Sequence, residues 1–184
     1  MANQSEVNML TKECILTALL RLMQENSYDS ISITDITALA GVSRMAYYRN
    51  YKSKDDILIK HLEEEESKLI ESLNGEKTED IKIIIKYVSS FFQENAMVIK
   101  AVYDAGLNHR LSGILSKRLY SYFPDANATT QGRYAVHFYV GAIFAVFRLW
   151  FSDGMKETVD EITDMIYSLI NRDSAAYLGK PVQK

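Results

Sequence analysis

The chain has 184 residues, a formal net charge of −3 and a sequence pI of about 5.7, and 47% of its residues are hydrophobic. This length provides for one or two domains with sizeable cores, and the apolar content with only two prolines excludes a disordered chain and favours helices. The first residues lack a basic segment followed by an apolar run, so no secretory signal is predicted and we expect a cytoplasmic protein.

The first predicted helix extends from about residue 5 to residue 25. One of its faces is apolar at helical spacing, which is typical of a helix that packs on a core. The residues of this face are Val7, Leu10, Cys14, Ile15, Ala18, Leu19 and Leu22. We expect the face to cover the back of the next two helices and to bury Cys14, which as a single cysteine can form neither an internal disulfide nor a CxxC zinc site. Residues 26–30 are predicted to form a loop.

Residues 32–54 predict two short helices joined by a tight turn. Ser32 and Asp35 have the S/T-x-x-D/E spacing in which each side chain can accept a bond from a free amide at a helix start. Gly41 follows where a chain leaving a helix often needs positive φ, and Ser43 can cap the second helix. Such a pair is a helix-turn-helix, whose second helix enters a DNA major groove.

The turn and the second helix carry a basic patch on an acidic protein. Between residues 41 and 54 the only groups charged at neutral pH are Arg44, Arg49, Lys52 and Lys54. Attraction to phosphate with counterion release supplies most non-specific DNA affinity, so a concentrated patch matters more than the overall charge. The segment therefore predicts DNA binding.

Residues 41–58, GVSRMAYYRNYKSKDDIL, resemble the turn, recognition helix and following helix start of the TetR/AcrR transcriptional regulators. The resemblance covers roughly the first third of the chain and implies an all-α, homodimeric, DNA-binding repressor with a separate effector-binding domain. Met45 and Ala46 stand where family members often have Gly or Pro and then Thr, and Asn50 replaces a common His. Because these positions usually touch DNA, the operator sequence cannot be carried over.

Helical spacing separates the two faces of the recognition helix. Tyr47 and Tyr51 are four residues apart and should point inward, whereas Arg44 and Tyr48 share the outward face. Arg44 is the best base-reading candidate, because its guanidinium can bond both O6 and N7 of a guanine. Met45 can contact a thymine methyl group. The predicted DNA-binding residues are Ser43, Arg44, Met45, Ala46, Tyr48, Arg49, Asn50, Lys52 and Lys54.

Several of these residues are expected to bond phosphate oxygens rather than bases. Tyr48, Arg49 and Asn50 would fix the register on DNA without reading its sequence. Lys54 resembles the family's lysine at the start of the next helix, where its charge and the helix amides would both face a phosphate. The alternative is that all of them are ordinary surface residues on a helical corner.

A long helix is predicted from near Lys54 to about Leu73, because Ser53 and Asp56 have capping-box spacing. The four glutamates at 63–66 point around this helix about 100 degrees apart, so they are predicted to be solvated rather than to form a metal or catalytic site. A turn follows. We expect a helix-turn-helix DNA-binding domain over residues 1–53 and a helical effector-binding and dimerisation domain over residues 54–184.

The second domain is predicted to be a helical bundle. Its helices begin near residue 81 and cover residues 96–103, 108–123, 134–151 and 156–171. The last two are apolar and resemble the TetR family's dimerisation pair, so we expect a four-helix bundle with their symmetry mates. The apolar run 135–147 contains His137 and is too short and too interrupted for a membrane span, which needs about 20 apolar residues. No membrane partner is expected.

Aromatic residues are frequent in this second domain and suggest an effector pocket, since small-molecule sites are mostly apolar with a few polar groups. The candidate lining residues are Phe91, Tyr103, Tyr120, Tyr134, His137 and Phe138. The alternative is plain hydrophobic core. The three histidines, His61, His109 and His137, lack ligand-like spacing, so neither a metal nor another cofactor is predicted.

Catalysis is not predicted, because GxxxxGK[ST], GxGxxG, HExxH and GxSxG motifs are all absent from the sequence. The favoured function is a ligand-responsive repressor that binds a palindromic DNA operator as a homodimer. One alternative is a regulator of the same fold that answers to a protein partner or to no ligand. The other is a helical ligand-binding or adaptor protein that has lost DNA binding.

Overall fold

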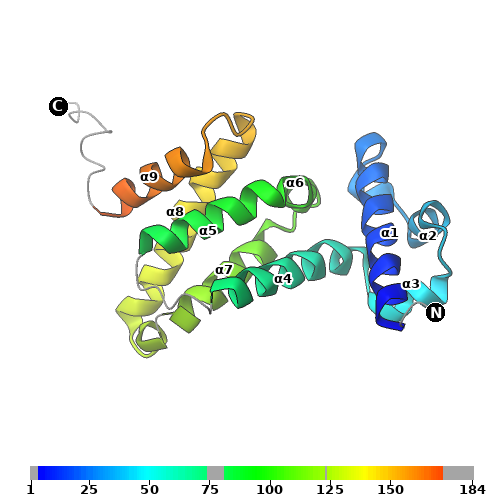
Figure 1. Cartoon of the computed structure of the whole chain (residues 1–184), viewed down its shortest axis with the longest axis horizontal. Coiled ribbons are helices and arrows are strands. Elements are labelled where there is room, and N and C mark those ends of the chain that lie inside the picture. Colours follow the sequence, from blue (N-terminus) through cyan, green and yellow to red (C-terminus); the bar gives the residue numbers. More distant parts are fainter. Residues whose placement is uncertain (1–3, 74–80, 123, 172–184) are drawn as a thin grey trace. The chain divides into compact units, whose positions relative to one another are not determined.

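The computed structural model describes residues 4–73, 81–122 and 124–171, and all regular elements in these ranges are helical (Figure 1). This confirms the predicted all-α fold. The elements in chain order are α1 (Gln4–Glu25), the 3₁₀ helix η1 (Tyr28–Ser30), α2 (Ile33–Ala40), α3 (Arg44–Asn50), α4 (Lys54–Leu73), α5 (Ile81–Glu94), α6 (Ala96–Asp104), α7 (Asn108–Tyr122), the 3₁₀ helix η2 (Pro124–Asn127), α8 (Thr130–Ser152) and α9 (Val159–Ile170).

The described chain divides into two compact units. The first contains the residues up to Glu65 together with Met97–Ile114, and the second contains Glu66–Ala96 and the residues from Leu115 onward. The first turns of α4 therefore belong with the N-terminal helices. The predicted domain boundary between residues 53 and 54 stays a prediction.

The core of the first unit forms where α1 contacts both α2 and α3. Ile15, Leu19, Ile36 and Tyr47 are completely buried. Removing these large side chains from water stabilises the first unit by about 1.5–3 kcal/mol each. This core holds the two short helices, which are too short to be stable alone.

The predicted burial of Cys14 is wrong, because its side chain is exposed. Leu10, one turn earlier on the predicted apolar face of α1, is 56% exposed. The buried residues of α1 are Ile15, Ala18 and Leu19, so the row of Leu10, Cys14 and Ala18 is covered at Ala18 and exposed at the other two positions. Spacing identified the helix, but the packing of its partners decided how far along it the apolar residues are covered.

The core of the second unit joins α5 to α8 and α9. Phe92 of α5 stacks on Phe147 of α8 with ring centroids 4.2 Å apart, and Trp150 lies beside Phe147 at 6.1 Å. On the α9 side, the buried Thr163 hydroxyl donates to the Ser89 hydroxyl at 3.4 Å. Three aromatic residues of the second domain, Phe92, Phe147 and Trp150, are therefore packed core.

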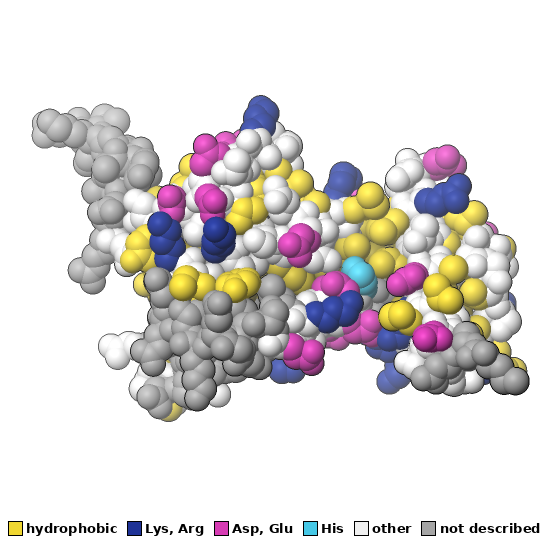
Figure 2. All heavy atoms as spheres, in the orientation of Figure 1, with side chains coloured by type: hydrophobic (Ala, Val, Ile, Leu, Met, Phe, Trp, Pro, Cys, Tyr) yellow, Lys and Arg dark blue, Asp and Glu magenta, His cyan; other side chains and the backbone are white. Residues whose placement is uncertain are grey.

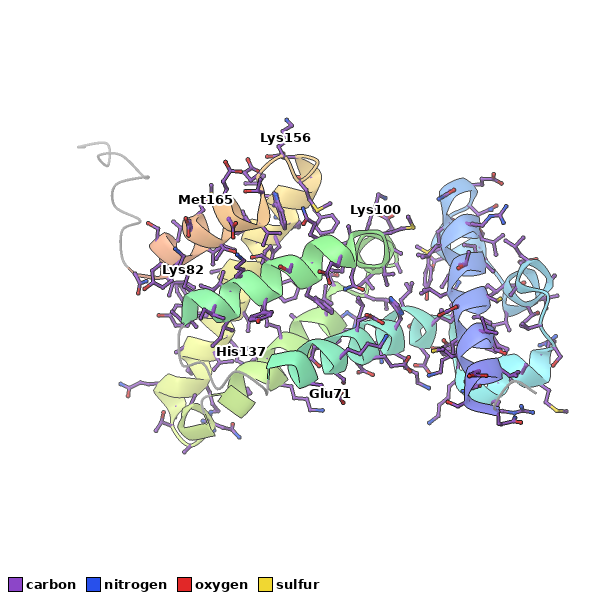
Figure 3. All side chains as sticks on the ribbon, viewed as in Figure 1. Glu71, Lys82, Lys100, His137, Lys156 and Met165 are labelled. Carbon is purple, nitrogen blue, oxygen red and sulfur yellow. The ribbon has the colours of Figure 1, made fainter. Side chains whose placement is uncertain are left out.

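Ion pairs line the outer edge of the contact between α5 and α9, where acidic and basic side chains lie next to one another (Figure 2). Lys82, on the α9 side of α5 (Figure 3), pairs with Asp164 at 2.7 Å, and Lys86 pairs with Asp160 at 2.7 Å. These side chains are about half exposed or more, and exposed pairs contribute only about 0–1 kcal/mol each. Apolar burial is the main stabilising contribution here.

The final helix begins at Val159 and not near residue 156 as predicted. Thr158 caps it in a capping box with Glu161: the Thr158 hydroxyl accepts from the Glu161 amide, and the Glu161 carboxylate accepts from the Thr158 amide at 2.8 Å. The Thr158 amide, and after it the Thr158 hydroxyl, donate to this carboxylate and hold the pKa of Glu161 below its usual range. The T-x-x-E spacing was visible in the sequence and could have placed this start correctly.

Candidate nucleic-acid interface

The start of α2 is held by the predicted capping box. The Ser32 hydroxyl accepts from the Asp35 amide at 3.2 Å, and the Asp35 carboxylate accepts from the Ser32 amide at 3.0 Å. The Ser32 hydroxyl and amide, in that order, hold the pKa of Asp35 below its usual range. Gly41 ends the helix with φ of 66°, a conformation that costs glycine little. The predicted helix-turn-helix is confirmed in its local chemistry.

The recognition helix α3 has the two faces that its spacing predicted. The Ser43 hydroxyl accepts from the Ala46 amide at 3.1 Å and so caps the helix start. Tyr47 and Tyr51 are 0% and 4% exposed, whereas Tyr48 is 51% exposed. The rings of Tyr47 and Tyr51 lie on the side of α3 that packs against α1 and α2. The opposite side of α3 is left free to enter a DNA groove.

Three cations lie on or next to the outward side of α3. Arg44, Arg49 and Lys52 are exposed, and none has an ion pair or a side-chain hydrogen bond within the described ranges. Met45 is 74% exposed between them. An exposed large apolar side chain beside unpaired cations is typical of a surface that contacts the base edges and phosphates of DNA.

Other predicted DNA-binding residues are partly engaged within α3. Asn50 is half-buried and donates one N–H from Nδ2 to the Ala46 carbonyl at 3.0 Å, which leaves its second N–H and its amide oxygen for other partners. Ala46 is half-buried, and the Ser43 hydroxyl already serves as the helix cap. These residues are placed to shape the surface, with fewer free donors than the sequence suggested.

Lys54 differs from every other member of the predicted set. Its Nζ donates to the carbonyl oxygens of Tyr28, Asp29 and Ile31 at 2.6, 3.3 and 3.1 Å. It also lies 4.4 Å from the centroid of the Tyr28 ring. The structure therefore places this ammonium against the chain before α2, and its predicted phosphate contact stays a prediction.

A recess beside α3 adds polar residues that sequence reasoning missed. Side chains of the first turns of α1 line it together with Arg49 and Asn50 of α3. The residues on α1 are Gln4, Ser5, Val7, Asn8 and Thr11. Hydroxyl and amide groups next to a recognition helix can bond phosphate oxygens. No local motif could have identified them, because they approach α3 only through the packing of α1.

The six residues predicted to line an effector pocket differ in their burial and in the unit to which they belong. Phe91 and Tyr120 are half-buried in the second unit, and Tyr103 is half-buried in the first. Tyr134, His137 and Phe138 are exposed on α8, where Tyr134 and Phe138 are 75% and 70% exposed. The described residues contain no group of three or more His, Cys, Asp or Glu side chains that could hold a metal ion. The pocket stays a prediction.

Comparison with known proteins follows the two parts of this architecture. Residues 15–60 match the sequence model of bacterial regulatory proteins of the tetR family, and residues 79–172 match that of a transcriptional regulator C-terminal region of TetR type. The HTH-type transcriptional regulator YwcC of Bacillus subtilis is 31% identical over 113 residues, which are 61% of this chain and 42% of YwcC. The chain thus matches less than half the length of this relative.

Solved structures share the fold over nearly the whole chain. A TetR-family transcriptional regulator from Syntrophomonas wolfei has a TM-score of 0.62 at 22% identity, covering 96% of this chain and 100% of that one. A fatty acid metabolism regulator from Clostridium perfringens has a TM-score of 0.60 at 17% identity, covering 92% of this chain and 100% of that one.

Proposed function

The chain belongs to the TetR family of bacterial regulatory proteins, and from this premise we propose that it is a homodimeric repressor that binds a palindromic operator and releases it when a small effector binds. One observation carries the proposal. The recognition helix buries Tyr47 completely while Arg44, Met45 and Tyr48 remain exposed beside unpaired cations. A helix with only a structural role would have no need of such a surface.

Arg44 is the proposed base reader, because it lies at the first position of α3 and has no competing partner in the described chain. N-terminal residues of a recognition helix are those that contact base edges. Arg49, Lys52 and Tyr48 would bond phosphates, with Met45 against a thymine methyl group. The polar first turns of α1 extend the phosphate-binding edge.

The dimer is proposed to form through α8 and α9. Tyr134, Phe138 and Leu149 of α8 are 75%, 70% and 62% exposed, while Val136, Val140 and Phe147 on its other side are buried. Met165 of α9 is 43% exposed. Apolar side chains presented along one face of a helix mark an interaction surface, and a second copy supplies an identical apolar face.

The sequence argument against a membrane span needs correction in one respect. Helix α8 has 23 residues and is long and apolar enough to cross a membrane by length and composition alone, and only 22% of its most apolar stretch is buried. Its buried face packs on α5 through Phe147 and Phe92, as a helix of a bundle does. We therefore propose that a second copy of the chain covers the exposed face of α8. The protein would then be cytoplasmic, like the DNA that it binds.

The effector is proposed to act through the C-terminal region. It must bind the DNA-competent and DNA-incompetent arrangements with different affinity, because a ligand with equal affinity shifts no equilibrium. In a dimer the two recognition helices must match half-sites about 34–36 Å apart or a multiple of this, so a small displacement is enough to lose one of them. One structural neighbour regulates fatty acid metabolism, which makes fatty acids the first probes.

The test begins by selecting duplexes from a random pool with the wild-type protein. Fluorescence anisotropy on the selected duplex should give tight binding whose logarithm falls linearly with log salt, with a slope of about −0.9 for each phosphate contacted. An affinity that does not depend on salt would refute DNA binding and favour an adaptor role. Binding that no small-molecule probe weakens would favour control by a protein partner or by no ligand.

A further inference from the structure

The outer side of α1 exposes apolar side chains next to the end of α2. Leu10 is 56% exposed, Cys14 one turn later is exposed, and Leu39 of α2 is 45% exposed. Exposed apolar side chains around a hollow indicate a surface that binds a partner. Such a hollow is present here as a recess of about 310 Å³, lined by Glu13, Cys14, Thr17, Ala18, Arg21, Leu39 and Ala40.

Three lining residues of α1 form a row with opposite charges at its two ends. Glu13, Thr17 and Arg21 are exposed and lie four positions apart, which makes them one of the i±4 ridges along which helices pack. Glu13 and Arg21 have no ion pair or side-chain hydrogen bond with a described residue, although Glu25 lies one turn beyond Arg21. The ridge thus has an unpaired acid, a small side chain and an unpaired base.

This order of charges is complementary to a second copy of itself. In a two-fold symmetric contact, residue i of one copy meets residue j of the other, and residue j meets residue i. When two antiparallel α1 helices meet at Thr17, Glu13 of each copy lies opposite Arg21 of the other. The commonest class of helix packing, with an interaxial angle of about −50°, places the i±4 ridges of both helices side by side. Ordinary helix packing therefore allows an ion pair on each side of Thr17.

Other classes of partner match this ridge less well. DNA phosphates would attract Arg21 and repel Glu13, which is equally far from Thr17 along the helix. A uniformly acidic or basic peptide would likewise pair with one end only. A second copy pairs with both ends, and Leu10 and Cys14 on the neighbouring ridge supply apolar area for the contact to bury.

We propose that α1 forms an antiparallel two-fold contact with α1 of a second copy, centred on Thr17. The α8 face proposed for the dimer belongs to the other unit, so the α1 contact is a second interface and would join two dimers. A crossing of two helices is smaller than the about 800 Å² per partner of a standard interface, so the contact is weak in dilute solution. It gains occupancy at high local concentration, as when two dimers bind neighbouring sites on one DNA molecule.

The experiment measures disulfide cross-linking, because a covalent bond captures a weak contact. Thr17→Cys is made in a Cys14→Ser background, so each chain carries one thiol. At the centre of the contact the two thiols reach the Cα separation of about 4.4–6.8 Å that a disulfide needs. The matched control is Gln24→Cys in the same background. Gln24 is also exposed on α1, but its two copies would lie about 21 Å apart along the helices at 1.5 Å per residue.

With diamide as the oxidant, Thr17→Cys should form a disulfide-linked dimer about tenfold faster than Gln24→Cys, since the contact raises the effective concentration of its thiols. Adding Glu13→Arg or Arg21→Glu places like charges opposite each other and should remove this advantage. Combining the two reversals restores opposite charges at both positions, so fast cross-linking should return. High salt should slow Thr17→Cys but not Gln24→Cys, because exposed ion pairs are screened.

Two results would overturn the proposal. One is equal cross-linking rates of Thr17→Cys and Gln24→Cys, and the other is a combined reversal that cross-links no faster than either single reversal. The substituted side chains are exposed, so the variants should fold, which circular dichroism verifies. Repeating the series with Phe138→Glu separates this contact from the proposed α8 dimer. A dimer that persists in sedimentation would count against the α8 interface, whereas the cross-linking rates still test α1.

Discussion

Replacing Tyr47 by Phe should stabilise the protein, which is an unusual expectation for a completely buried residue. The Tyr47 hydroxyl is buried and has no hydrogen-bond partner among the described residues. An unsatisfied buried polar group costs about 1–3 kcal/mol. Phe keeps the ring contacts with Tyr48 and Tyr51, whose centroids lie 5.3 and 5.8 Å away.

The expected gain can be estimated from these two contributions. Deleting the hydroxyl opens a void of roughly 10 Å³, which at about 24 cal/mol per Å³ costs about 0.2 kcal/mol. The net increase in the free energy of unfolding is therefore about 0.8–2.8 kcal/mol. Since 1 kcal/mol shifts Tm by about 2–4 °C for a chain of this size, the melting temperature should rise by at least about 2 °C.

Urea unfolding at equal protomer concentration measures the change, with Tyr28→Phe as the matched control. The same atom is deleted there, but the Tyr28 hydroxyl donates to the Asp55 carboxylate at 2.5 Å. Hydrogen bonds to charged groups contribute about 1.5–3 kcal/mol, so this variant should lose stability. A loss of 1 kcal/mol or more in Tyr47→Phe would show that the hydroxyl has a partner and refute the reasoning.

The pH dependence of the same variant gives an independent check. Burial, and after it the neighbouring Tyr48, raise the pKa of Tyr47 from its ordinary 10.0 to about 12. Between these values the unfolded chain loses the phenolic proton while the native state keeps it, so native stability falls as pH rises. Tyr47→Phe lacks this contribution, and its stability should fall less steeply by up to about 1.4 kcal/mol per pH unit.

Three further predictions concern the surfaces of the molecule. Arg44→Ala should cost about 1–3 kcal/mol on the selected duplex and relax preference at one base position, and equal weakening on a shuffled duplex would make Arg44 a phosphate contact instead. Phe138→Glu places a charge on the exposed face of α8, so sedimentation in detergent-free buffer should show a monomer, and an unchanged dimer would exclude this face from the interface. Cys14→Ser should change the free energy of unfolding by less than about 0.5 kcal/mol, because the thiol is exposed; a larger loss in urea unfolding would contradict that placement.

Features that depend on residues within one helical turn were predicted correctly. Ser32 with Asp35 started α2, Gly41 ended it, and Ser43 started α3, because each cap is a bond between groups three or four residues apart. The two faces of α3 followed in the same way from the spacing of Tyr47 and Tyr48. Even the start of α9, which was placed wrongly, was present locally in Thr158 and Glu161.

Features that depend on what a helix packs against could not be predicted. Spacing placed Cys14 on an apolar row of α1, but this row is buried at Ala18 and exposed at Cys14. Spacing also placed Tyr134 and Phe138 in an apolar helix, and only the packing of α8 on α5 showed which side is exposed. Equal hydrophobicity on two sides of a helix carries no information about which side its neighbour covers.

Lys54 is a residue for which the sequence determines one property and the tertiary structure another. The sequence by itself determined that a cation stands at the start of α4 beside a DNA-binding motif, since helix starts and charge are local properties. Only the tertiary structure brought three carbonyls from the loop between α1 and α2 within 3.3 Å of its ammonium. The residues joined lie more than 20 positions apart, and packing alone decides whether such a charge faces DNA or its own chain.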